Sequence, residues 1–97
     1  MTDDMPELTE KDFQRTLVRG HRQRLMAGEF HSGQDVADLR AFVGLTQVEF
    51  AQALGISVRT LQGWEQGRRR PDGPSIALLR IAARHPKIIR ENVASAA

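Results

Sequence analysis

The sequence predicts an all-α fold of five or six short helices, and three observations support this class. Apolar residues recur at helical spacing along most of the 97 residues, as in Val58, Leu61 and Trp64. Helix-capping residues precede several of these stretches, and glycine or proline follows them. No stretch shows the convincing alternation of apolar and polar residues that is typical of a half-buried strand. A chain of this length forms one compact domain.

The first helices are predicted from their capping signals. An N-terminal helix is expected to begin at Thr9 and to end near Gly28. Residues 28–34 combine glycine with polar side chains, which is typical of a linker. Asp35 is the expected N-cap of the next helix, and Gly44 is the expected stop.

The central segment predicts two helices joined by a tight turn. Thr46 and Glu49 have capping-box spacing, which opens the first of these helices, and Gly55 ends it. Ser57 caps the second helix, which ends at Gly67. Two helices with this spacing form a helix-turn-helix, a geometry that presents its second helix to the major groove of DNA.

The C-terminal part predicts two further helices, one from Pro74 to His85 and a short one restarted by Pro86. Residues 1–30 are therefore interpreted as an N-terminal arm or helix, and residues 31–97 as a DNA-binding domain with a C-terminal dimerisation region. The apolar residues expected at the dimer interface are Ile81, Ile88, Ile89 and Val93. The same four side chains could instead close the core of the domain.

Composition and charge narrow the function classes. Residues 1–12 contain five acidic side chains and one lysine, whereas residues 57–90 contain eight basic and two acidic side chains. This asymmetry favours a basic face for a polyanion. The chain has no cysteine and no apolar run long enough to span a membrane, so we expect a cytoplasmic protein without a membrane partner.

Catalytic and metal sites are not expected. The three histidines, His21, His31 and His85, have no second ligand at a metal-binding spacing. No serine or threonine has a nearby histidine and acid in sequence, and the glycines form no phosphate-binding loop. We therefore expect neither an enzyme nor a cofactor.

The segment 45–67, LTQVEFAQALGISVRTLQGWEQG, resembles the Xre/lambda-repressor-like helix-turn-helix family, and the resemblance extends over about residues 35–84. The longer string 57–86, with its WEQGRRRPDGP block, is similar to the HigA/NadS-type antitoxins. Those proteins repress their own operon and bind a small ribonuclease toxin. The first 30 residues resemble no family that we can name.

The resemblance implies roles for individual residues. It implies DNA contacts by Gln47, Ser57, Val58, Arg59, Thr60 and Gln62, with Gln47 and Ser57 on phosphates and Arg59 on a guanine. Thr60 is assigned to a phosphate or a thymine methyl. Arg40 and Glu65 are implied to form a structural ion pair. Gly63 departs from the pattern, because many relatives carry a longer base-reading side chain there.

Two more assignments concern the second helix of the motif, the recognition helix, and the loop that follows it. The run Arg68, Arg69 and Arg70 follows the recognition helix, and we expect these side chains to track phosphates. Trp64 is expected in the core rather than on a base.

The expected function is a transcriptional repressor that binds a palindromic operator as a homodimer. The subgroup resemblance adds a small basic toxin protein as a partner, for which the N-terminal helix is a candidate binding segment. That helix could also simply pack on the core. Two alternatives remain: a free-standing, phage-like regulator without a toxin, and an interaction module that has lost DNA binding.

Overall fold

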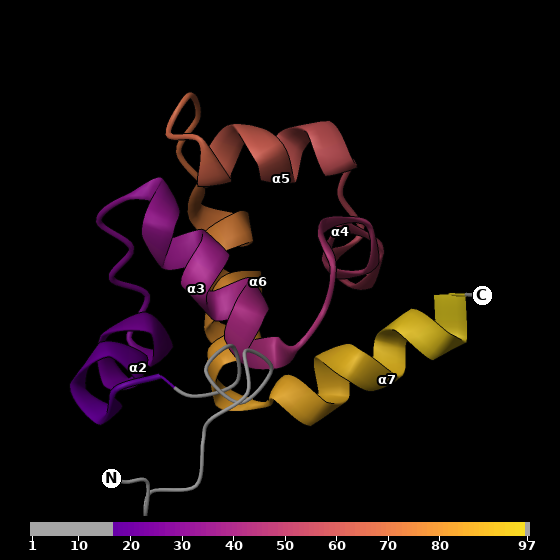
Figure 1. Cartoon of the computed structure of the whole chain (residues 1–97), viewed down its shortest axis with the longest axis horizontal. Coiled ribbons are helices and arrows are strands. Elements are labelled where there is room, and N and C mark those ends of the chain that lie inside the picture. The colour runs from indigo at the N-terminus through magenta and orange to yellow at the C-terminus, as the bar shows by residue number, and fades with distance from the viewer. Residues whose placement is uncertain (1–16, 97) are drawn as a thin grey trace, which may run out of the picture.

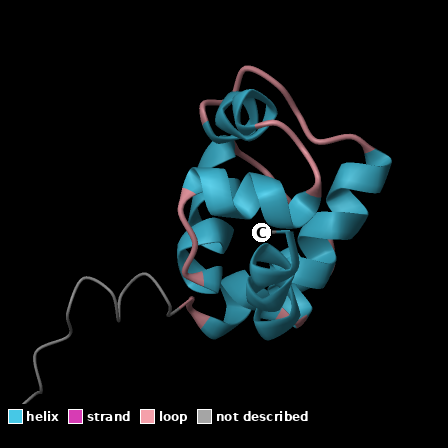
Figure 2. Cartoon of the chain, turned by 90° about the vertical axis from the view of Figure 1, so that its right-hand side faces the viewer, coloured by secondary structure: helices cyan, strands magenta, loops and turns pink. Residues whose placement is uncertain are grey.

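The computed structural model describes residues 17–96, which form helices joined by short loops (Figure 1). Six helices and no strand occur in this part of the chain (Figure 2), which confirms the predicted all-α class. In chain order they are α2 (Arg19–Met26), α3 (Gly33–Val43), α4 (Gln47–Leu54), α5 (Val58–Glu65), α6 (Gly73–Arg84) and α7 (Pro86–Ala96). None of these helices is long and apolar enough to cross a membrane.

One hydrophobic core joins the six helices. Each contributes at least one buried side chain, namely Leu25, Leu39, Phe50, Leu61, Leu79 and Ile89. Burial of a leucine or phenylalanine side chain contributes roughly 1.5–3 kcal/mol to folding. Trp64 is only 4% exposed and belongs to the same core, as predicted. Because α2 supplies Leu25 to this cluster, it is an integral part of the folded unit.

The helix-turn-helix boundaries agree with the capping signals. The Thr46 hydroxyl accepts a hydrogen bond from the Glu49 backbone N–H (3.1 Å), and the Glu49 carboxylate accepts one from the Thr46 N–H (3.0 Å). Gly55 has a φ of +74°, a conformation that side chains rarely adopt, and it turns the chain from α4 to α5. The Ser57 hydroxyl accepts from the Thr60 N–H and caps α5. These contacts fix the start of α5 relative to the end of α4.

The predicted N-terminal helix is wrong over part of its length. Residues 9–16 lie outside the described part of the chain. Val18 has an extended conformation (φ −56°, ψ 138°), so α2 begins only at Arg19 and Leu17 is not helical. The end of the helix agrees better, since α2 stops at Met26 and Gly28 follows with a left-handed φ of +86°.

The predicted start of α3 is also wrong. The helix begins at Gly33 with Ser32 in the N-cap position, whereas Asp35 lies in the first turn. The Asp35 carboxylate is buried against α2 and accepts hydrogen bonds from that helix, so it does not cap α3. Gly33 is needed here for space, because a Cβ at this position would overlap the backbone carbonyl oxygens of Trp64 and Glu65. The first turn of α3 therefore packs directly on the end of α5.

The C-terminal helix closes the domain. The Arg90 guanidinium donates a hydrogen bond to the Val43 carbonyl (3.0 Å), and the Asn92 amide donates one to the Ala53 carbonyl (2.7 Å). Ile89 is 6% exposed and Val93 packs partly against the core, which agrees with their alternative role as core residues. The other two candidates for a dimer interface, Ile81 and Ile88, are 44% and 55% exposed.

Candidate nucleic-acid interface

Helix α5 lies at one edge of the molecule (Figure 1), with one face in the core and the other toward solvent. Leu61 and Trp64 point inward and are buried. Arg59 and Gln66, on the opposite face, are exposed, and Gln62 is partly exposed. The described residues therefore leave the polar side of α5 open to a ligand.

The first turn of α5 has a mixed environment. The Ser57 hydroxyl donates to the Thr60 hydroxyl (2.9 Å) in addition to accepting the capping hydrogen bond from the Thr60 N–H. Ser57 is exposed, while Thr60 is partly buried. Val58, which the resemblance assigned to a base, packs partly against the core. Of the predicted base contacts in this turn, Arg59 is thus the most accessible.

A network of side-chain hydrogen bonds connects α5 to α3 and α4. The Arg40 Nε donates to the Glu65 Oε2 at 2.7 Å, and the second guanidinium contact reaches Oε1 at 3.1 Å. The Glu65 carboxylate, whose side chain is 8% exposed, also accepts from the Gln47 amide at 3.0 Å. Bidentate pairs of this kind fix geometry as well as charge. Arg40 on α3 therefore holds the orientation of the last turn of α5.

Two residues assigned to DNA contact take part in the same network. The Gln62 amide donates to the Gln47 side-chain oxygen at 3.3 Å, and Gln47 in turn donates to Glu65. This arrangement links the first turn of α4 to the middle of α5. The resemblance assigned these two residues to different parts of the DNA, and their mutual contact was not predicted.

A groove runs along the open side of α5 and the loop that follows it. Its volume is about 440 Å³. The residues that line it are Arg59, Gln62, Gly63, Gln66, Arg68 and Arg69. Within the described residues, no hydrogen bond or ion pair engages the guanidinium of any of these three arginines. Three unpaired cations beside two amides form a surface suited to phosphate and base edges.

The loop after α5 is folded back onto the helix. The backbone N–H groups of Arg68 and Arg69 both donate to the Gly63 carbonyl, at 2.9 and 3.2 Å. Arg68, Arg69 and Arg70 are all exposed. Arg70 lies away from the groove and instead lines a second cavity with His31 and Pro71, to which Arg69 also contributes. The arginine run thus presents cations on more than one side of the loop.

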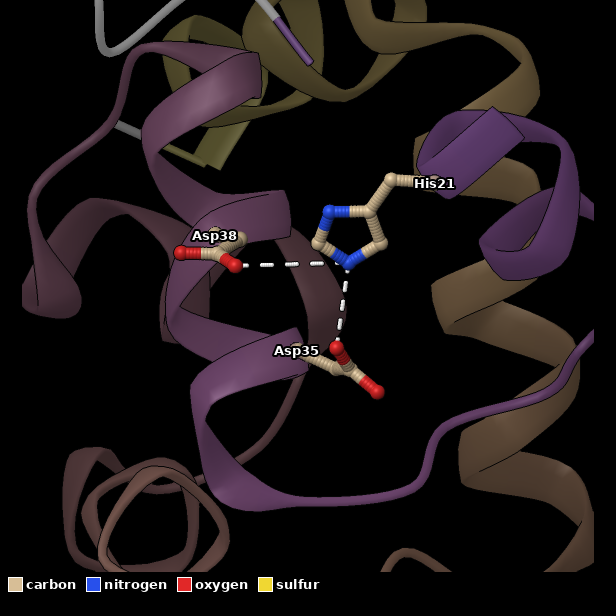
Figure 3. Close-up of side chains that lie close together, drawn as sticks. All are labelled: His21, Asp35 and Asp38. Atoms are coloured by element: carbon tan, nitrogen blue, oxygen red, sulfur yellow. Dashed lines mark hydrogen bonds and ion pairs between the residues drawn. The ribbon is translucent and has the colours of Figure 1, made fainter. Parts of the chain in front are cut away.

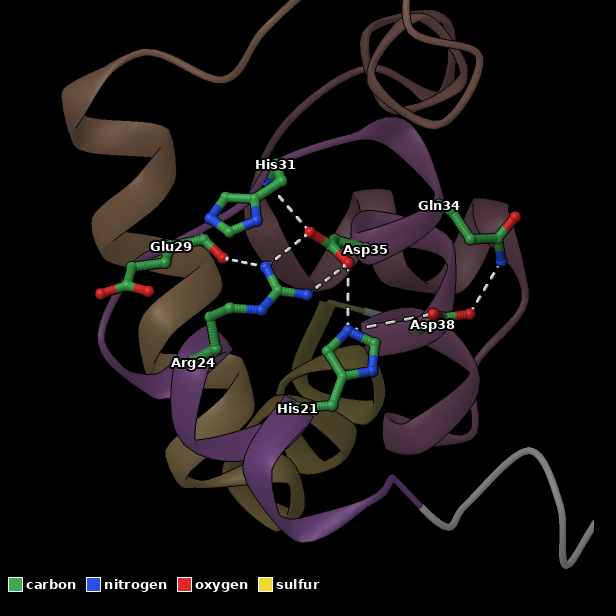
Figure 4. Close-up of polar contacts among 7 residues, drawn as sticks. All are labelled: His21, Arg24, Glu29, His31, Gln34, Asp35 and Asp38. Carbon is green, nitrogen blue, oxygen red and sulfur yellow. Dashed lines mark hydrogen bonds and ion pairs between the residues drawn. The ribbon is translucent and has the colours of Figure 1, made fainter.

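A second polar cluster, not predicted from the sequence, joins α2 to α3 (Figure 4). Asp35 is the one charged residue that is buried in the described part of the chain. Both of its carboxylate oxygens accept from the Arg24 guanidinium, at 2.9 and 3.0 Å, and the His31 backbone N–H donates to Oδ2 at 2.8 Å. The Arg24 guanidinium holds the pKa of the Asp35 carboxyl well below its usual range, against the opposing effect of burial. The cluster fastens α2 to the domain.

His21 belongs to the same cluster (Figure 3). Its Nε2 lies 3.0 Å from Asp35 Oδ1 and 4.0 Å from Asp38 Oδ2, so three potential metal ligands come within 4.8 Å of one another. Sequence spacing missed this group because His21 and Asp35 are 14 residues apart. The Arg24 guanidinium already occupies both oxygens of Asp35, and its charge opposes a cation there. The arrangement is accounted for as an ion-pair cluster between two helices.

Known proteins are similar to this chain in the segment that contains α4 and α5. Residues 36–82 match the family described as "Helix-turn-helix". The chain is 36% identical over 58 residues to a protein named "Antitoxin HigA-2" from Vibrio cholerae, an alignment that covers 60% of this chain and 56% of the relative. It is 30% identical over 57 residues to "Uncharacterized HTH-type transcriptional regulator YiaG" from Escherichia coli K12, with 59% of each chain covered.

The chain thus spans somewhat more than half of the length of these curated relatives. No solved structure shows significant similarity to it. The family match includes most of α3, all of α4 and α5, and most of α6, and of these helices α3 and α4 pack on α5. The helices around α5 and the match of residues 36–82 to the helix-turn-helix family both support the helix-turn-helix that the sequence predicts.

Proposed function

We propose that this protein is a transcriptional repressor that reads a specific DNA sequence by inserting α5 into the major groove. One observation carries the proposal. Helix α5 is held by a partly buried ion pair and a side-chain network, while its open face presents Arg59, Gln62 and loop arginines that have no partner among the described residues. A rigid helix with such a face fits the major groove, where an arginine can bind guanine O6 and N7.

The proposed DNA contacts are of two kinds: contacts to phosphates, which position the protein, and contacts to base edges, which read the sequence. We assign Gln47 and Ser57, at the N-terminal ends of the two motif helices, to phosphates, and Arg59 and Gln62 to base edges. Thr60 and Val58 are closer to the core, so their contacts would be limited to the thymine methyl or the sugar-phosphate backbone. Arg68 and Arg70 supply sequence-independent attraction to the backbone.

The repressor would act by occlusion, as a dimer on a palindromic operator. The helix-turn-helix proteins place two recognition helices about 34 Å apart on successive turns of DNA. Ile81 and Ile88 are large apolar side chains exposed near the junction of α6 and α7, which makes this junction the candidate dimer contact. A second copy of the chain is the occupant that two-fold operator symmetry requires.

Selection from a random duplex library, followed by gel shifts on the enriched sequence, tests DNA recognition. We expect a palindromic motif and a complex that contains two chains. A promoter fusion carrying that motif should be silenced by the intact protein and released by Arg59→Ala. An enriched motif without symmetry, bound by one chain, would contradict the dimeric operator but not the use of α5.

We further propose that the protein is the antitoxin of a toxin–antitoxin pair. The support is its similarity to a relative named "Antitoxin HigA-2" and the acidic segment 1–12, which is complementary to a small basic protein. Residues 1–30 are the candidate partner-binding segment. The partner would be a ribonuclease toxin encoded beside this chain.

The test is co-expression with the protein encoded by the neighbouring reading frame. A stable complex that weakens at high salt, and weakens further when Asp3, Asp4 and Glu7 are changed to amides, supports the pairing. The matched control is Glu91→Gln, a charge change on α7. Absence of a complex favours the second candidate, a free-standing regulator, to which the similarity to YiaG is the pointer.

A further inference from the structure

Gly63 marks a gap on the recognition helix that another residue fills. The sequence places a glycine on α5 one turn after Arg59, or about 6 Å along the helix axis. Although it carries no side chain, Gly63 is buried in the folded chain. Its covering comes from the loop that follows the helix.

The Arg69 side chain lies across this gap. A Cβ placed on Gly63 would be 3.3 Å from the Arg69 Cδ, 3.4 Å from its Cγ and 3.7 Å from its Cβ. The aliphatic stem of Arg69 therefore occupies the space that a side chain at position 63 would take. Two hydrogen bonds from the loop backbone to the Gly63 carbonyl hold the stem in this place.

The guanidinium of Arg69 is available to a ligand. Arg69 is exposed and lines the α5 groove with Arg59 and Gln62. Five other arginines of the described chain donate hydrogen bonds to protein atoms: Arg22, Arg24, Arg40, Arg84 and Arg90. Arg69 has no such partner among the described residues, so its planar group is not committed to the fold.

We propose that Arg69 is a base-reading residue, which contacts guanine in the major groove through the position left empty by Gly63. The proposal rests on the proposed insertion of α5 into that groove. It differs from the expectation that all three loop arginines track phosphates. A guanidinium satisfies guanine O6 and N7 with two hydrogen bonds, and a stem already packed on α5 loses less rotamer freedom on binding.

The experiment compares four full-length proteins in selections from a random duplex library, followed by competition binding: wild type, Arg59→Ala, Arg69→Ala and Arg70→Ala. Arg70 is the matched control, because it is adjacent and equally charged but does not line the groove. We expect Arg69→Ala to lose the preference for guanine at one base pair, by roughly 5- to 150-fold. That base pair should differ from the one affected by Arg59→Ala, and Arg70→Ala should weaken all sequences alike.

A second variant tests directly whether Arg69 takes the place of a base-reading side chain at position 63. Gly63→Gln in the Arg69→Ala background restores a side chain at position 63 without displacing an arginine. We expect it to select a base at the pair where Arg69→Ala lost its preference, with adenine as the partner of glutamine. Circular dichroism and thermal unfolding establish that each variant is folded, and Arg69→Ala alone decides the proposal if Gly63→Gln is not.

Two results would overturn the inference, and they differ. If Arg69→Ala keeps every base preference and only flattens the salt dependence, Arg69 is a phosphate contact and the proposed function stands. If the wild-type protein enriches no sequence, the repressor proposal and the role of Arg69 fall together.

Discussion

Two arginine-rich regions of this protein use the same side chain in opposite ways. Between α2 and α3, the Arg24 guanidinium donates two hydrogen bonds to the buried Asp35 carboxylate, so its partner lies within the fold (Figure 4). Along α5 and its loop, the guanidinium groups of Arg59 and Arg69 have no partner among the described residues. The first region stabilises the fold, whereas the second presents charge to a ligand. An arginine is assigned to the framework or to the interface by its partner, not by its type.

The largest effect is expected from removing the charge of Asp35, the partner of Arg24. Asp35→Asn removes the negative charge and replaces one of the two oxygens that together accept four hydrogen bonds, two of them from Arg24, with an NH2 donor. We expect the free energy of unfolding to fall by about 3 kcal/mol, measured by urea denaturation. Asp38→Asn is the control, because its carboxylate is one-third exposed and 4.0 Å from His21. Equal losses from the two changes would show that the cluster is not the anchor of α2.

Acid offers a second measurement of the same cluster. The lowered pKa of Asp35, caused first by Arg24, means that the folded protein keeps this carboxylate ionised at a pH where the unfolded chain binds a proton. The resulting stability is fully present above about pH 4, the ordinary range of an aspartate, and is lost as the pH falls further toward the folded pKa. We expect the stability difference between wild type and Asp35→Asn to shrink below about pH 4. A difference that is constant from neutral pH to pH 2 would contradict the assignment.

Two glycines at α5 have different neighbours: Gly33 of α3 lies against the end of α5, and Gly63 is part of α5 itself. A Cβ at Gly33 would meet backbone carbonyls, which cannot move aside, whereas a Cβ at Gly63 meets the flexible stem of Arg69. We expect Gly33→Ala to lower the free energy of unfolding by about 2 kcal/mol. Gly63→Ala should cost less than half as much in the same denaturation experiment. A larger loss for Gly63→Ala would mean that Arg69 is fixed by the fold rather than held ready for DNA.

Arg59→Ala tests the interface without touching the framework. Its side chain is exposed and makes no hydrogen bond within the described residues, so thermal unfolding should be unchanged. Specific binding should weaken by about 1–3 kcal/mol, and the preference at one base pair should relax. Competition with single-base variants of the selected site measures both effects. Preserved preference at every position would remove Arg59 from base reading.

Much of the architecture could be predicted from the sequence because its signals are local. The capping box at Thr46 and Glu49, the left-handed turn at Gly55 and the Ser57 cap each depend on residues within four positions. The burial of Trp64 followed from helical spacing alone. Such features need no knowledge of what lies across the core.

The features that the sequence did not predict depend on contacts between distant segments. Asp35 has the local signature of an N-cap, but a guanidinium 11 residues earlier in the chain competes for its carboxylate, and Ser32 takes the capping position. Gly33 approaches residues of α5 that are more than 30 positions away in the chain. The local composition around Gly33 could not indicate this contact and was interpreted as a linker. The run of three arginines also gave no sign that Arg69 packs on Gly63, because this contact depends on how the loop after α5 folds back onto the helix.

The smallest expected effect belongs to Arg70, the loop arginine outside the α5 groove. If it contacts a phosphate, Arg70→Ala removes one neutralised charge, and the slope of log affinity against log salt should flatten by about one unit. The loss should be equal for the selected site and for random DNA, since a phosphate carries no sequence information. Arg80→Ala is the control, because Arg80 packs beside Gly28 rather than at α5, and its removal should leave the slope unchanged. A flatter slope with Arg80→Ala would mean that the DNA-facing surface extends to α6, and that unpaired arginines outside the groove also bind the backbone.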